Sequence, residues 1–392
     1  MRRRALRRWG NARLALTDAD GEGRRLVMSW MADLGLDVTV DGIGNVVATY
    51  AGTDPSLAPV MMGSHIDTVG TGGRFDGCLG VLAGLEVVET MATMGVRLPP
   101  PCASRSSPTK KVRFPPDMLG SLVYVGGLSL EAALDARSSD GARLGDELSR
   151  IGFAGPTPCP AADPPYAFLE LHIEQGPVLE DEGITIGAVT RVQGISWSEF
   201  TIEGRSAHAG TTPIRLRRDP TIAMARVIEA ARELALEFGD EQVCTVGRID
   251  VVPNLVNVVP QRVTFTLDVR NTDEQVLRAA EARLFEVVDR AARSEGCTIV
   301  RTTLARFEPV EFDPTMIDLV ESTARELGYS CRRMPSGAGH DAQMLARVCP
   351  TSMIFVPSVD GLSHNLAEFT TTEDLAAGAN VLLHAVRSLA RS

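Results

Sequence analysis

Three histidines stand in loops that follow apolar, strand-like stretches, and the side chains around them suit a metal site. His65 and Asp67 come directly after the apolar residues PVMM, and Asp76 follows in the same glycine-rich loop. His172 lies near the end of the stretch LELHI, and His364 lies in the loop GLSHNLAE after TSMIFVP. Imidazole and carboxylate groups bind divalent ions, and open α/β sheets hold their sites in such loops. The pattern predicts a metal site, with turn and capping roles as the alternative for each residue alone. Asp67 is spaced to hold the second nitrogen of His65.

The elements that must position these residues follow two patterns. From about residue 26 to 95, and again after 312, short apolar strands alternate with helices such as LGVLAGLEVVETMATMG, which indicates an α/β fold with a mostly parallel central sheet. Between them the order is strand, helix, two strands, helix, strand, as in a ferredoxin-like α+β sandwich. We therefore expect a catalytic domain formed by residues 1–190 and 308–392, interrupted by an inserted lid domain at 191–307.

Composition excludes several classes of function. The 392 residues carry a formal net charge of −11, which disfavours nucleic acid and anionic membranes as partners because both would repel the chain. No apolar run reaches the roughly 18 residues of a membrane span, and the basic start MRRRALRRWG lacks the apolar stretch of a signal peptide. The seven cysteines include no CxxC pair and are expected to be reduced, mostly buried thiols. We expect a cytoplasmic protein.

Six ordered blocks of sequence resemble a known family, the amidase and carbamoylase branch of the M20 metallohydrolases. They are GSHIDTVGTGGRFDGCLGVLAGLEV, FLELHIEQGPVLE, RVQGISWSEFTIEGRSAHAGTTP, NLVNVVPQRVTFTLDVRN, SGAGHDAQML and SHNLAEFTT. This branch includes N-carbamoyl-L-amino-acid hydrolases, beta-ureidopropionases and allantoate amidohydrolases. The resemblance implies two divalent metal ions, zinc or else manganese, cobalt or nickel, with Asp76 bridging them, His65 and His172 on one and His364 on the other. It also implies a homodimer formed through the lid domain.

The resemblance also implies a set of substrate residues. His208 of AHAGTTP would reach the partner subunit's site and stabilise the developing oxyanion. Asn257 and Arg270 match positions that bind the substrate carboxylate, for which a guanidinium is well suited. Gln175 and the loop 337–340, with Gly339 and His340, would line the same pocket. Without the resemblance, we would interpret Arg270 as a solvated charge at a strand end and His208 as a loop residue. We expect His384, inside the last helix, to have a packing or surface role.

One segment departs from the family pattern. After the helix that ends at Gly95, the family has an apolar strand followed by Asn-Glu-Glu-Gly, where the first glutamate is the general base and the second a metal ligand. Here the sequence is PPPCASRSSPTKKV, with the only two lysines of the chain, Lys110 and Lys111, where the glutamates should be. Its prolines and serines predict a poor interior strand. The chain as it stands therefore lacks the base and one ligand.

A compensated pair of frame changes over about residues 101–112 would explain this segment. Serine codons of the TCN type, read one base earlier, give Val, Ile, Leu or Phe, and two AAG lysine codons give Glu-Glu. One permitted reading of the segment is PVRVAVFTNEEG. The alternative is a real surface loop with a lysine pair. The short arginine-rich start of the chain suggests a second fault of annotation, because the family begins with a further helix.

Three functions remain open from the sequence. The first is metal-dependent hydrolysis of a linear amide or ureido C–N bond, with an N-carbamoyl amino acid favoured narrowly over ureidopropionate and allantoate. The second is an inactive relic, because lysines at the site would repel one metal ion. The third is an M20 peptidase or aminoacylase, which HIEQGP and AGTTP disfavour.

Overall fold

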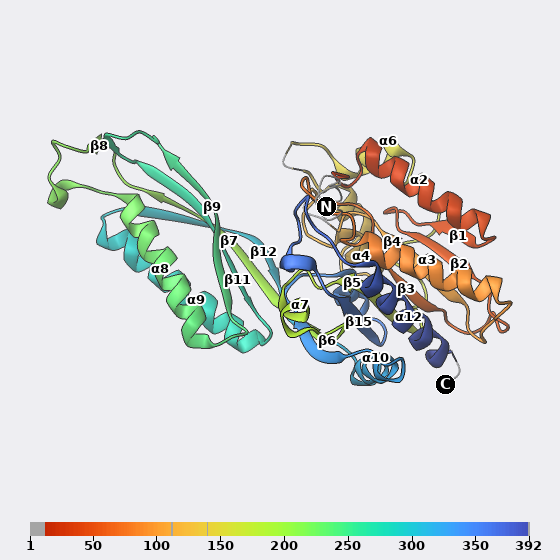
Figure 1. The fold of residues 1–392 in the computed structure, drawn as a ribbon. Coiled ribbons are helices and arrows are strands. Elements are labelled where there is room, and N and C mark those ends of the chain that lie inside the picture. The colour runs from red at the N-terminus through yellow and green to blue at the C-terminus, as the bar shows by residue number, and fades with distance from the viewer. Residues whose placement is uncertain (1–11, 111–112, 139, 391–392) are drawn as a thin grey trace, which may run out of the picture. The chain divides into compact units, whose positions relative to one another are not determined.

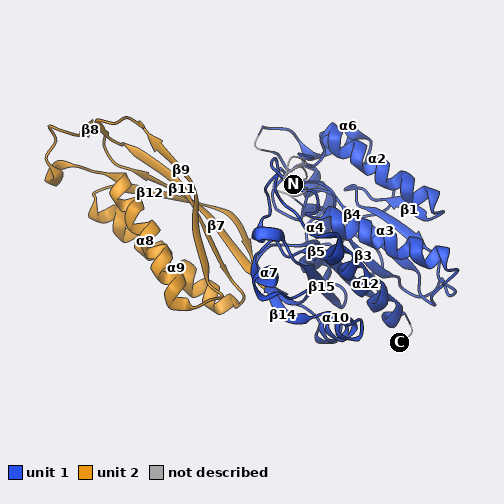
Figure 2. Cartoon of the chain, in the orientation of Figure 1, with its two compact units in different colours: residues 1–192, 311–392 blue, residues 193–310 orange. Residues whose placement is uncertain are grey.

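The computed structural model describes residues 12–110, 113–138 and 140–390. The chain divides into two compact units (Figure 2): unit 1 comprises Met1–Val192 and Glu311–Ser392, and unit 2 comprises Gln193–Val310. The boundaries expected from sequence, 190 and 307, lie two and three residues before 192 and 310. The basic start and Lys111 fall outside the described residues. Every described helix is too short or too polar to cross a bilayer.

Unit 1 is built on a nine-stranded sheet (Figure 1), in the order β1-β2-β4-β3-β5-β15-β6-β13 with β14 beside β6. Its central pairs β4/β3, β3/β5 and β5/β15 are parallel, as is β14/β6, whereas β1/β2, β2/β4 and β15/β6 are antiparallel. The predicted mostly parallel sheet is therefore confirmed. The strands are β1 (Asp37–Val40), β2 (Val46–Tyr50), β3 (Val60–His65), β4 (Cys102–Ser107), β5 (Ala167–Ile173), β6 (Ile186–Val192), β13 (Val310–Glu311), β14 (Cys331–Ser336) and β15 (Thr351–Val356).

Helices pack on this sheet because the apolar face of each helix lies against buried apolar side chains of the strands. α3 (Cys78–Thr93) packs against β3, β4 and β5, and α12 (Thr372–Leu389) packs against α3 and β15. α12 begins where the Thr371 hydroxyl accepts a bond from the Asp374 amide, a side-chain cap. The other helices of unit 1 are α2 (Asp18–Asp33), α4 (Leu119–Tyr124), α5 (Leu130–Leu134), α6 (Leu144–Ile151), α7 (Val178–Glu182), α10 (Pro314–Glu326) and α11 (Asp341–Leu345).

Unit 2 is an antiparallel sheet in the order β12-β7-β11-β9 whose one face is covered by two helices. Alternation along β11 places Val263, Phe265, Leu267 and Val269 in the core under α8 and α9. This confirms the ferredoxin-like insertion. Its elements are β7 (Gly194–Glu203), β8 (Ala207–His208), α8 (Pro220–Phe238), β9 (Val243–Val252), β10 (Val258–Val259), β11 (Arg262–Asn271), α9 (Glu274–Ser294) and β12 (Thr298–Phe307).

We expected residues 101–112 to make a poor interior strand, but the backbone of part of this segment does form one. CASRSS forms β4, which pairs with both β2 and β3 and is buried at every position. Close approach to β3 is possible because Gly63 has φ +152°, and a Cβ there would lie 2.1 Å from the Arg105 carbonyl oxygen. The segment thus forms an interior strand of the sheet although its side chains are polar.

Burial leaves the polar atoms of β4 poorly satisfied. Ser104 Oγ, Ser106 Oγ, and Nε and Nη1 of Arg105 have no hydrogen-bond partner among the described residues. The Arg105 side chain is fully buried; its Nη2 donates to Asn45 Oδ1 at 2.5 Å, and its guanidinium lies 4.6 Å from the centre of the Tyr124 ring. Unsatisfied buried groups cost about 1–3 kcal/mol each. This strand is therefore a weak point in the centre of the sheet.

The seven cysteines are free thiols, as expected. Four of them, Cys78, Cys102, Cys297 and Cys349, are buried. Burial raises the pKa of Cys349 to about 11, so this thiol stays protonated and unreactive at neutral pH.

Candidate metal centre

Asp76 lies among the three histidines that the sequence pattern singled out. Its Oδ1 is 3.6 Å from His65 Nε2 and 3.4 Å from His172 Nε2, and its Oδ2 is 3.4 Å from His364 Nε2. Two histidines thus face one carboxylate oxygen, and the third faces the other oxygen. A carboxylate in this position can bridge two sites or orient two imidazoles around one ion.

Backbone contacts set the imidazoles in the form that a metal needs. His65 Nδ1 lies 2.8 Å from the Asp67 carbonyl oxygen, and His172 Nδ1 lies 2.8 Å from that of Ile173. A carbonyl only accepts hydrogen bonds, so each Nδ1 carries the proton and each Nε2 keeps a lone pair; that of His172 accepts from the Gly77 amide at 3.2 Å.

The donor set therefore fits a divalent ion. One ligand atom each from His65, Asp76 and His172 lie within 4.8 Å of one another, and all three residues are buried. His65 Nε2 has no hydrogen-bond partner among the described residues. A buried lone pair without a donor is costly in an apolar interior, and an ion at this place would satisfy it.

Asp67 holds His65 differently from the sequence-based expectation. Its backbone carbonyl accepts the bond from Nδ1, while its Oδ1 is 3.6 Å from the same nitrogen. The main chain of Asp67, and not its side chain, makes the hydrogen bond to the second imidazole nitrogen. The carboxylate instead accepts from the Lys110 amide at 3.4 Å.

Neighbouring strands and one glycine turn bring these residues together. β3 and β5 are parallel neighbours, so His65, the last residue of β3, and His172 of β5 lie toward the same edge of the sheet. Gly77 has φ +68°, and a Cβ there would lie 2.4 Å from the His65 ring. Only glycine lets the chain turn this closely past the imidazole.

Glu368 fixes the Asp76 loop, and sequence reasoning did not assign it a role. Its Oε1 accepts from the amides of Phe75 and Asp76, both at 3.1 Å, and its Oε2 accepts from Ser363 Oγ at 3.0 Å. The buried carboxylate thus ties the loop of Asp76 to the loop that carries His364. Its place in the block SHNLAEFTT was the only signal in the sequence.

A second group of potential ligands, Glu170, His172 and His340, lies beside the first. Glu170 Oε1 accepts from Ser64 Oγ at 2.6 Å and Oε2 accepts from the Ala342 amide at 2.7 Å. Burial raises the pKa of Glu170 to about 7. Because both its oxygens already accept hydrogen bonds, this group is a less suitable metal site than the first. Glu170 was missed, although it precedes His172 by two residues on the same face of β5.

Asp341 completes the acidic environment behind the histidines. Ser107 Oγ and Ser121 Oγ each donate to it at 2.5 Å. Its side chain is fully buried. Sequence reasoning also missed this residue, because its partners lie more than two hundred residues away along the chain.

Lys110 lies inside this acidic region. Its side chain is only 3% exposed, and the Met118 amide donates to its carbonyl oxygen at 3.2 Å. Burial opposes its charge, but neighbouring carboxylates outweigh that effect and raise the pKa of the ammonium above its ordinary value. In order of effect these carboxylates are Asp117, Asp76, Asp341 and Glu170. Lys110, which we expected to oppose a metal ion, is thus buried, and its charged form is favoured by carboxylates that include Asp76.

Three expected substrate residues are in unit 1. Gln175 has φ +60°, and its Nε2 donates to Ser363 Oγ at 2.8 Å, next to His364 in the chain. His340 is fully buried and packs edge-on against His172, with ring centres 4.5 Å apart. Gly339 precedes it, with Met118 close by. The structure thus places His340 against His172, one of the Asp76 histidines.

The other three are in unit 2. His208 and Asn257 are neighbours, because the Ala209 amide donates to the Asn257 carbonyl at 3.0 Å. The amides of Gly210 and Thr211 donate to His208 Nδ1, which leaves Nε2 as the protonated nitrogen of the neutral ring.

Arg270 lies elsewhere on the sheet of unit 2. Its Nε and Nη2 donate to both oxygens of Asp268, and its guanidinium lies 5.7 Å from the centre of the Trp197 ring. The Arg270 side chain is therefore ion-paired with Asp268 and is not a solvated charge at a strand end.

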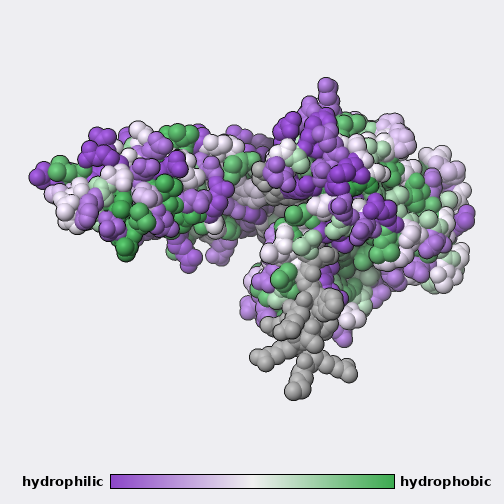
Figure 3. Space-filling model, turned by 90° about the horizontal axis from the view of Figure 1, so that it is seen from above, coloured by the Kyte–Doolittle hydropathy of each residue, from purple (hydrophilic) through white to green (hydrophobic). Residues whose placement is uncertain are grey.

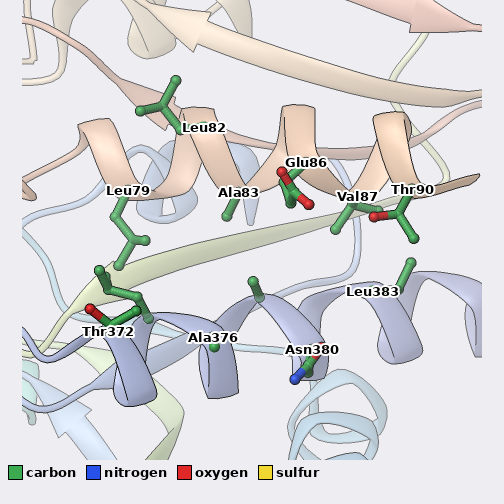
Figure 4. A pocket seen from close by; sticks show the side chains of 12 residues that line it. Leu79, Leu82, Ala83, Glu86, Val87, Thr90, Thr372, Ala376, Asn380 and Leu383 are labelled. Carbon is green, nitrogen blue, oxygen red and sulfur yellow. The ribbon is translucent and has the colours of Figure 1, made fainter. Parts of the chain in front are cut away.

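A cavity elsewhere in unit 1 is lined mostly by apolar side chains and has no histidine or aspartate in its lining. It measures about 530 Å³ and lies between α3 and α12, with Leu79, Val87 and Leu383 among its lining side chains (Figure 4). Glu86 is its only ionisable residue. His384 lies on α12, partly buried, and does not line it.

Comparison with known proteins shows which family the chain resembles. A family model described as peptidase family M20/M25/M40 matches residues 115–388. An N-carbamoyl-L-amino-acid amidohydrolase of Rhizobium meliloti is 45% identical over 378 residues, 96% of this chain and 91% of that protein. An allantoate amidohydrolase of Bacillus subtilis is 35% identical over 383 residues, 97% and 93% of the two chains.

A solved structure is similar over nearly the whole chain. The crystal structure of an amidase of the hydantoinase/carbamoylase family from Burkholderia multivorans has a TM-score of 0.91 at 45% identity, and it covers 98% of this chain and 93% of that one. The resemblance stated from the motifs is thereby confirmed. The chain belongs to peptidase family M20/M25/M40, and its relatives in that family include amidohydrolases.

Proposed function

We propose that this lineage carries out metal-dependent hydrolysis of a linear amide or ureido C–N bond in an N-carbamoyl amino acid or a related ureido acid. The observation that carries the proposal is the arrangement of three histidines around Asp76, two of them with Nε2 presented as a lone pair. The 45% identity to an N-carbamoyl-L-amino-acid amidohydrolase supports the substrate class.

Each residue then has a defined task. His65, Asp76, His172 and His364 would hold divalent metal, zinc or else manganese, cobalt or nickel, and the family pattern implies two ions. A bound ion supplies Lewis-acid polarisation of the scissile carbonyl and of water. The environment of Asp76 supports this role, because its loop is fixed by Glu368.

Unit 2 would supply the donors that recognise the acid. His208 presents Nε2–H and can donate to a developing oxyanion of the partner subunit's substrate. Following the family pattern, Arg270 and Asn257 would bind the substrate carboxylate, and Gln175, Gly339 and His340 would contact the substrate.

We further propose that residues 101–112 arose by a compensated frame change, and that Asn-Glu-Glu-Gly stood at 109–112. Burial of Ser104, Arg105 and Ser106 with unpartnered polar atoms supports the idea, since the alternative reading makes all three apolar. Lys110, buried at the position where the family pattern has its general base, favours a second candidate for the chain as it stands, an inactive pseudoenzyme. Allantoate is the alternative substrate, favoured by the 35% identity to an allantoate amidohydrolase.

We also propose a homodimer that forms through unit 2 in the cytoplasm. Exposed apolar side chains support the choice of surface. Leu236 of α8 is 70% exposed, and Ile249 of β9 is 45% exposed. Hydrophobic side chains interrupt the hydrophilic surface of this unit in Figure 3.

A substrate panel tests the proposed activity. The full chain, and a second chain in which residues 101–112 read PVRVAVFTNEEG, are assayed with N-carbamoyl amino acids, ureidopropionate, allantoate, N-acetyl amino acids and dipeptides. We expect the second chain to release product from an N-carbamoyl amino acid, and the first to be at least about a hundredfold slower, because a general base contributes about 10²–10⁴-fold. Hydrolysis confined to dipeptides would refute the proposal.

A matched variant tests the base itself. In the second chain, glutamine in place of glutamate at position 110 is expected to abolish turnover while metal content stays nearly unchanged. Retained turnover would remove the assignment of the base to position 110. If the first chain is as active as the second, the frame-change proposal is wrong.

A further inference from the structure

The outward face of α3 combines an exposed leucine with carboxylates that have no cation beside them. Leu82 is 42% exposed, and Glu86 and Glu89 follow it at positions i+4 and i+7, so the three side chains share one face of the helix. Among the described residues, neither glutamate side chain takes part in an ion pair or a hydrogen bond, and α3 itself contains no lysine or arginine. This face therefore offers an apolar contact next to uncompensated negative charge.

Leu82 borders two cavities, and Glu86 lines both of them. The first is the cavity of about 530 Å³ between α3 and α12, where Leu79 points toward α12 (Figure 4). The second measures about 410 Å³ and lies between α3 and the end of α2, and its lining includes Asp33 and the 41% exposed Trp30. Contiguous exposed apolar surface is commonly an interaction site. The matching occupant has apolar side chains for the cavities and positive charge for their acidic rim.

The described part of the chain begins beside the first of these cavities. Arg13 is fixed at the start of α3, because its amide donates to Thr68 Oγ1 at 2.7 Å and its guanidinium donates to Cys78 Sγ at 3.0 Å. Cys78 is the first residue of α3, and Leu79, which follows it, lines the cavity. Four extended residues span about 13 Å and eleven span about 36 Å, whereas the 16 residues of α3 measure about 24 Å along the helix axis. Residues that precede Arg13 can therefore reach either cavity.

The sequence before Arg13 has the composition that this face requires. Residues 1–11, which lie outside the described part of the chain, read MRRRALRRWGN. They include five arginines, Leu6 and Trp9, and they include no acidic residue. Trp9 precedes Arg13 by four positions, which is within reach of the Leu79 end of the first cavity. The segment thus supplies both the apolar side chains and the positive charge.

We propose that residues 1–11 dock onto the outward face of α3 of their own chain, with the Trp9 indole in the cavity between α3 and α12 and the arginines beside Glu86 and Glu89. Arginine suits this place, because its guanidinium pairs with carboxylates while its stem covers apolar surface. A tether of three residues between Trp9 and Arg13 keeps the local concentration of the segment far above that of a second copy. The inference goes beyond the proposed function and uses neither its metal nor its substrate, so either can fail without the other.

Fluorescence of Trp9 in the full chain tests the docking. The chain has three tryptophans, so W30F and W197F together leave Trp9 as the only one. We expect its native emission maximum to lie at shorter wavelength than in urea, and its quenching by acrylamide to be weaker, because the docked indole is removed from water. Native emission and quenching equal to those in urea would overturn the proposal. A blue shift that appears only as the protein concentration rises would assign the cavity to the start of a second copy, and would also overturn docking within one chain.

A variant of α12 tests the placement of the indole. Ala376 is exposed and lines the first cavity, so A376F fills the cavity from α12 without disturbing a buried position. In the background with Trp9 as the only tryptophan, A376F should remove the blue shift while circular dichroism shows that the chain is folded. Retention of the blue shift in A376F would refute the assignment of Trp9 to this cavity.

Charge reversal tests the part of the arginines. E86K/E89K should raise the rate at which trypsin cleaves within residues 2–8 at least about fivefold, because attraction to the face becomes repulsion and the segment is undocked more often. E131K/E326K makes the same change of charge at two exposed glutamates of unit 1 that line neither cavity, and should leave the cleavage rate unchanged. An unchanged rate in E86K/E89K, or an equal increase in both variants, would refute the contact of the arginines with this face.

Discussion

At the scale of single residues, the site depends on a few contacts between distant parts of the chain. Asp76 and His364 are 288 positions apart (364 minus 76), and Glu368 bonds to the loops of both. The Glu368 carboxylate is 4% exposed, so its two acceptor oxygens are removed from water and committed to these loops. Such supporting contacts typically change metal affinity by 10- to 100-fold.

We therefore expect E368A to weaken metal binding by at least about tenfold, because the Phe75 and Asp76 amides lose their acceptor. E368Q keeps one carbonyl oxygen for those amides and should retain most of the affinity. Competition with a chromophoric chelator measures both variants. E373A, an exposed glutamate of the following helix, is the matched control. Unchanged affinity in E368A would show that the Asp76 loop is positioned by other contacts.

Residue types and spacing predicted part of this site. His65, Asp76, His172 and His364 could be found because they lie at the ends of strands or in the loops that follow them, and parallel strands carry their sites at one end of the sheet. Glu368, Asp341 and Glu170 could not be found in this way. Glu368 accepts from the Asp76 amide, Asp341 accepts from two serines, and Glu170 accepts from Ser64. No local pattern in the sequence predicts such distant partners.

At the scale of elements, β4 shows that the strand propensity of its residues does not predict its secondary structure. The sequence CASRSS has the composition of a loop, yet the chain places it between β2 and β3, where both neighbours supply ladder hydrogen bonds. Tertiary context overrides the weak preference of serine and arginine. The helices and the strands of unit 2 were predictable because their apolar positions recur with the right period, whereas β4 has no such pattern.

Two serines of β4 should respond in opposite ways to the same change. Ser106 Oγ is buried without a hydrogen-bond partner, so S106A should leave the free energy of unfolding unchanged or raise it by about 1 kcal/mol. Ser107 Oγ donates to Asp341, so S107A should lower it by about 1–3 kcal/mol. Urea denaturation of both variants measures the difference. Equal destabilisation would mean that Ser106 has a partner in solution.

At the scale of the whole molecule, unit 2 has two sheet edges, and they differ in character. β9 and β12 are the end strands of the order β12-β7-β11-β9. α8 packs beside β9 and has three exposed apolar side chains, Ile222, Ile228 and Leu236. α9, which is described over its full length, has no exposed large hydrophobic side chain. The edge formed by β9 and α8 is therefore the better candidate for contact with a second copy.

An open strand edge next to exposed apolar side chains favours association with another chain. We expect the protein to elute as a dimer in size-exclusion chromatography with light scattering. L236E and I249K place charges on the α8 and β9 surface and should shift the protein toward monomer, because burying an unpaired charge in an interface costs several kcal/mol. L304E places the same kind of charge on the β12 edge, where Leu304 is 46% exposed, and should leave the dimer intact. A dimer that dissociates only in L304E would assign the interface to the opposite edge, and a monomeric unaltered chain would exclude self-association through either edge.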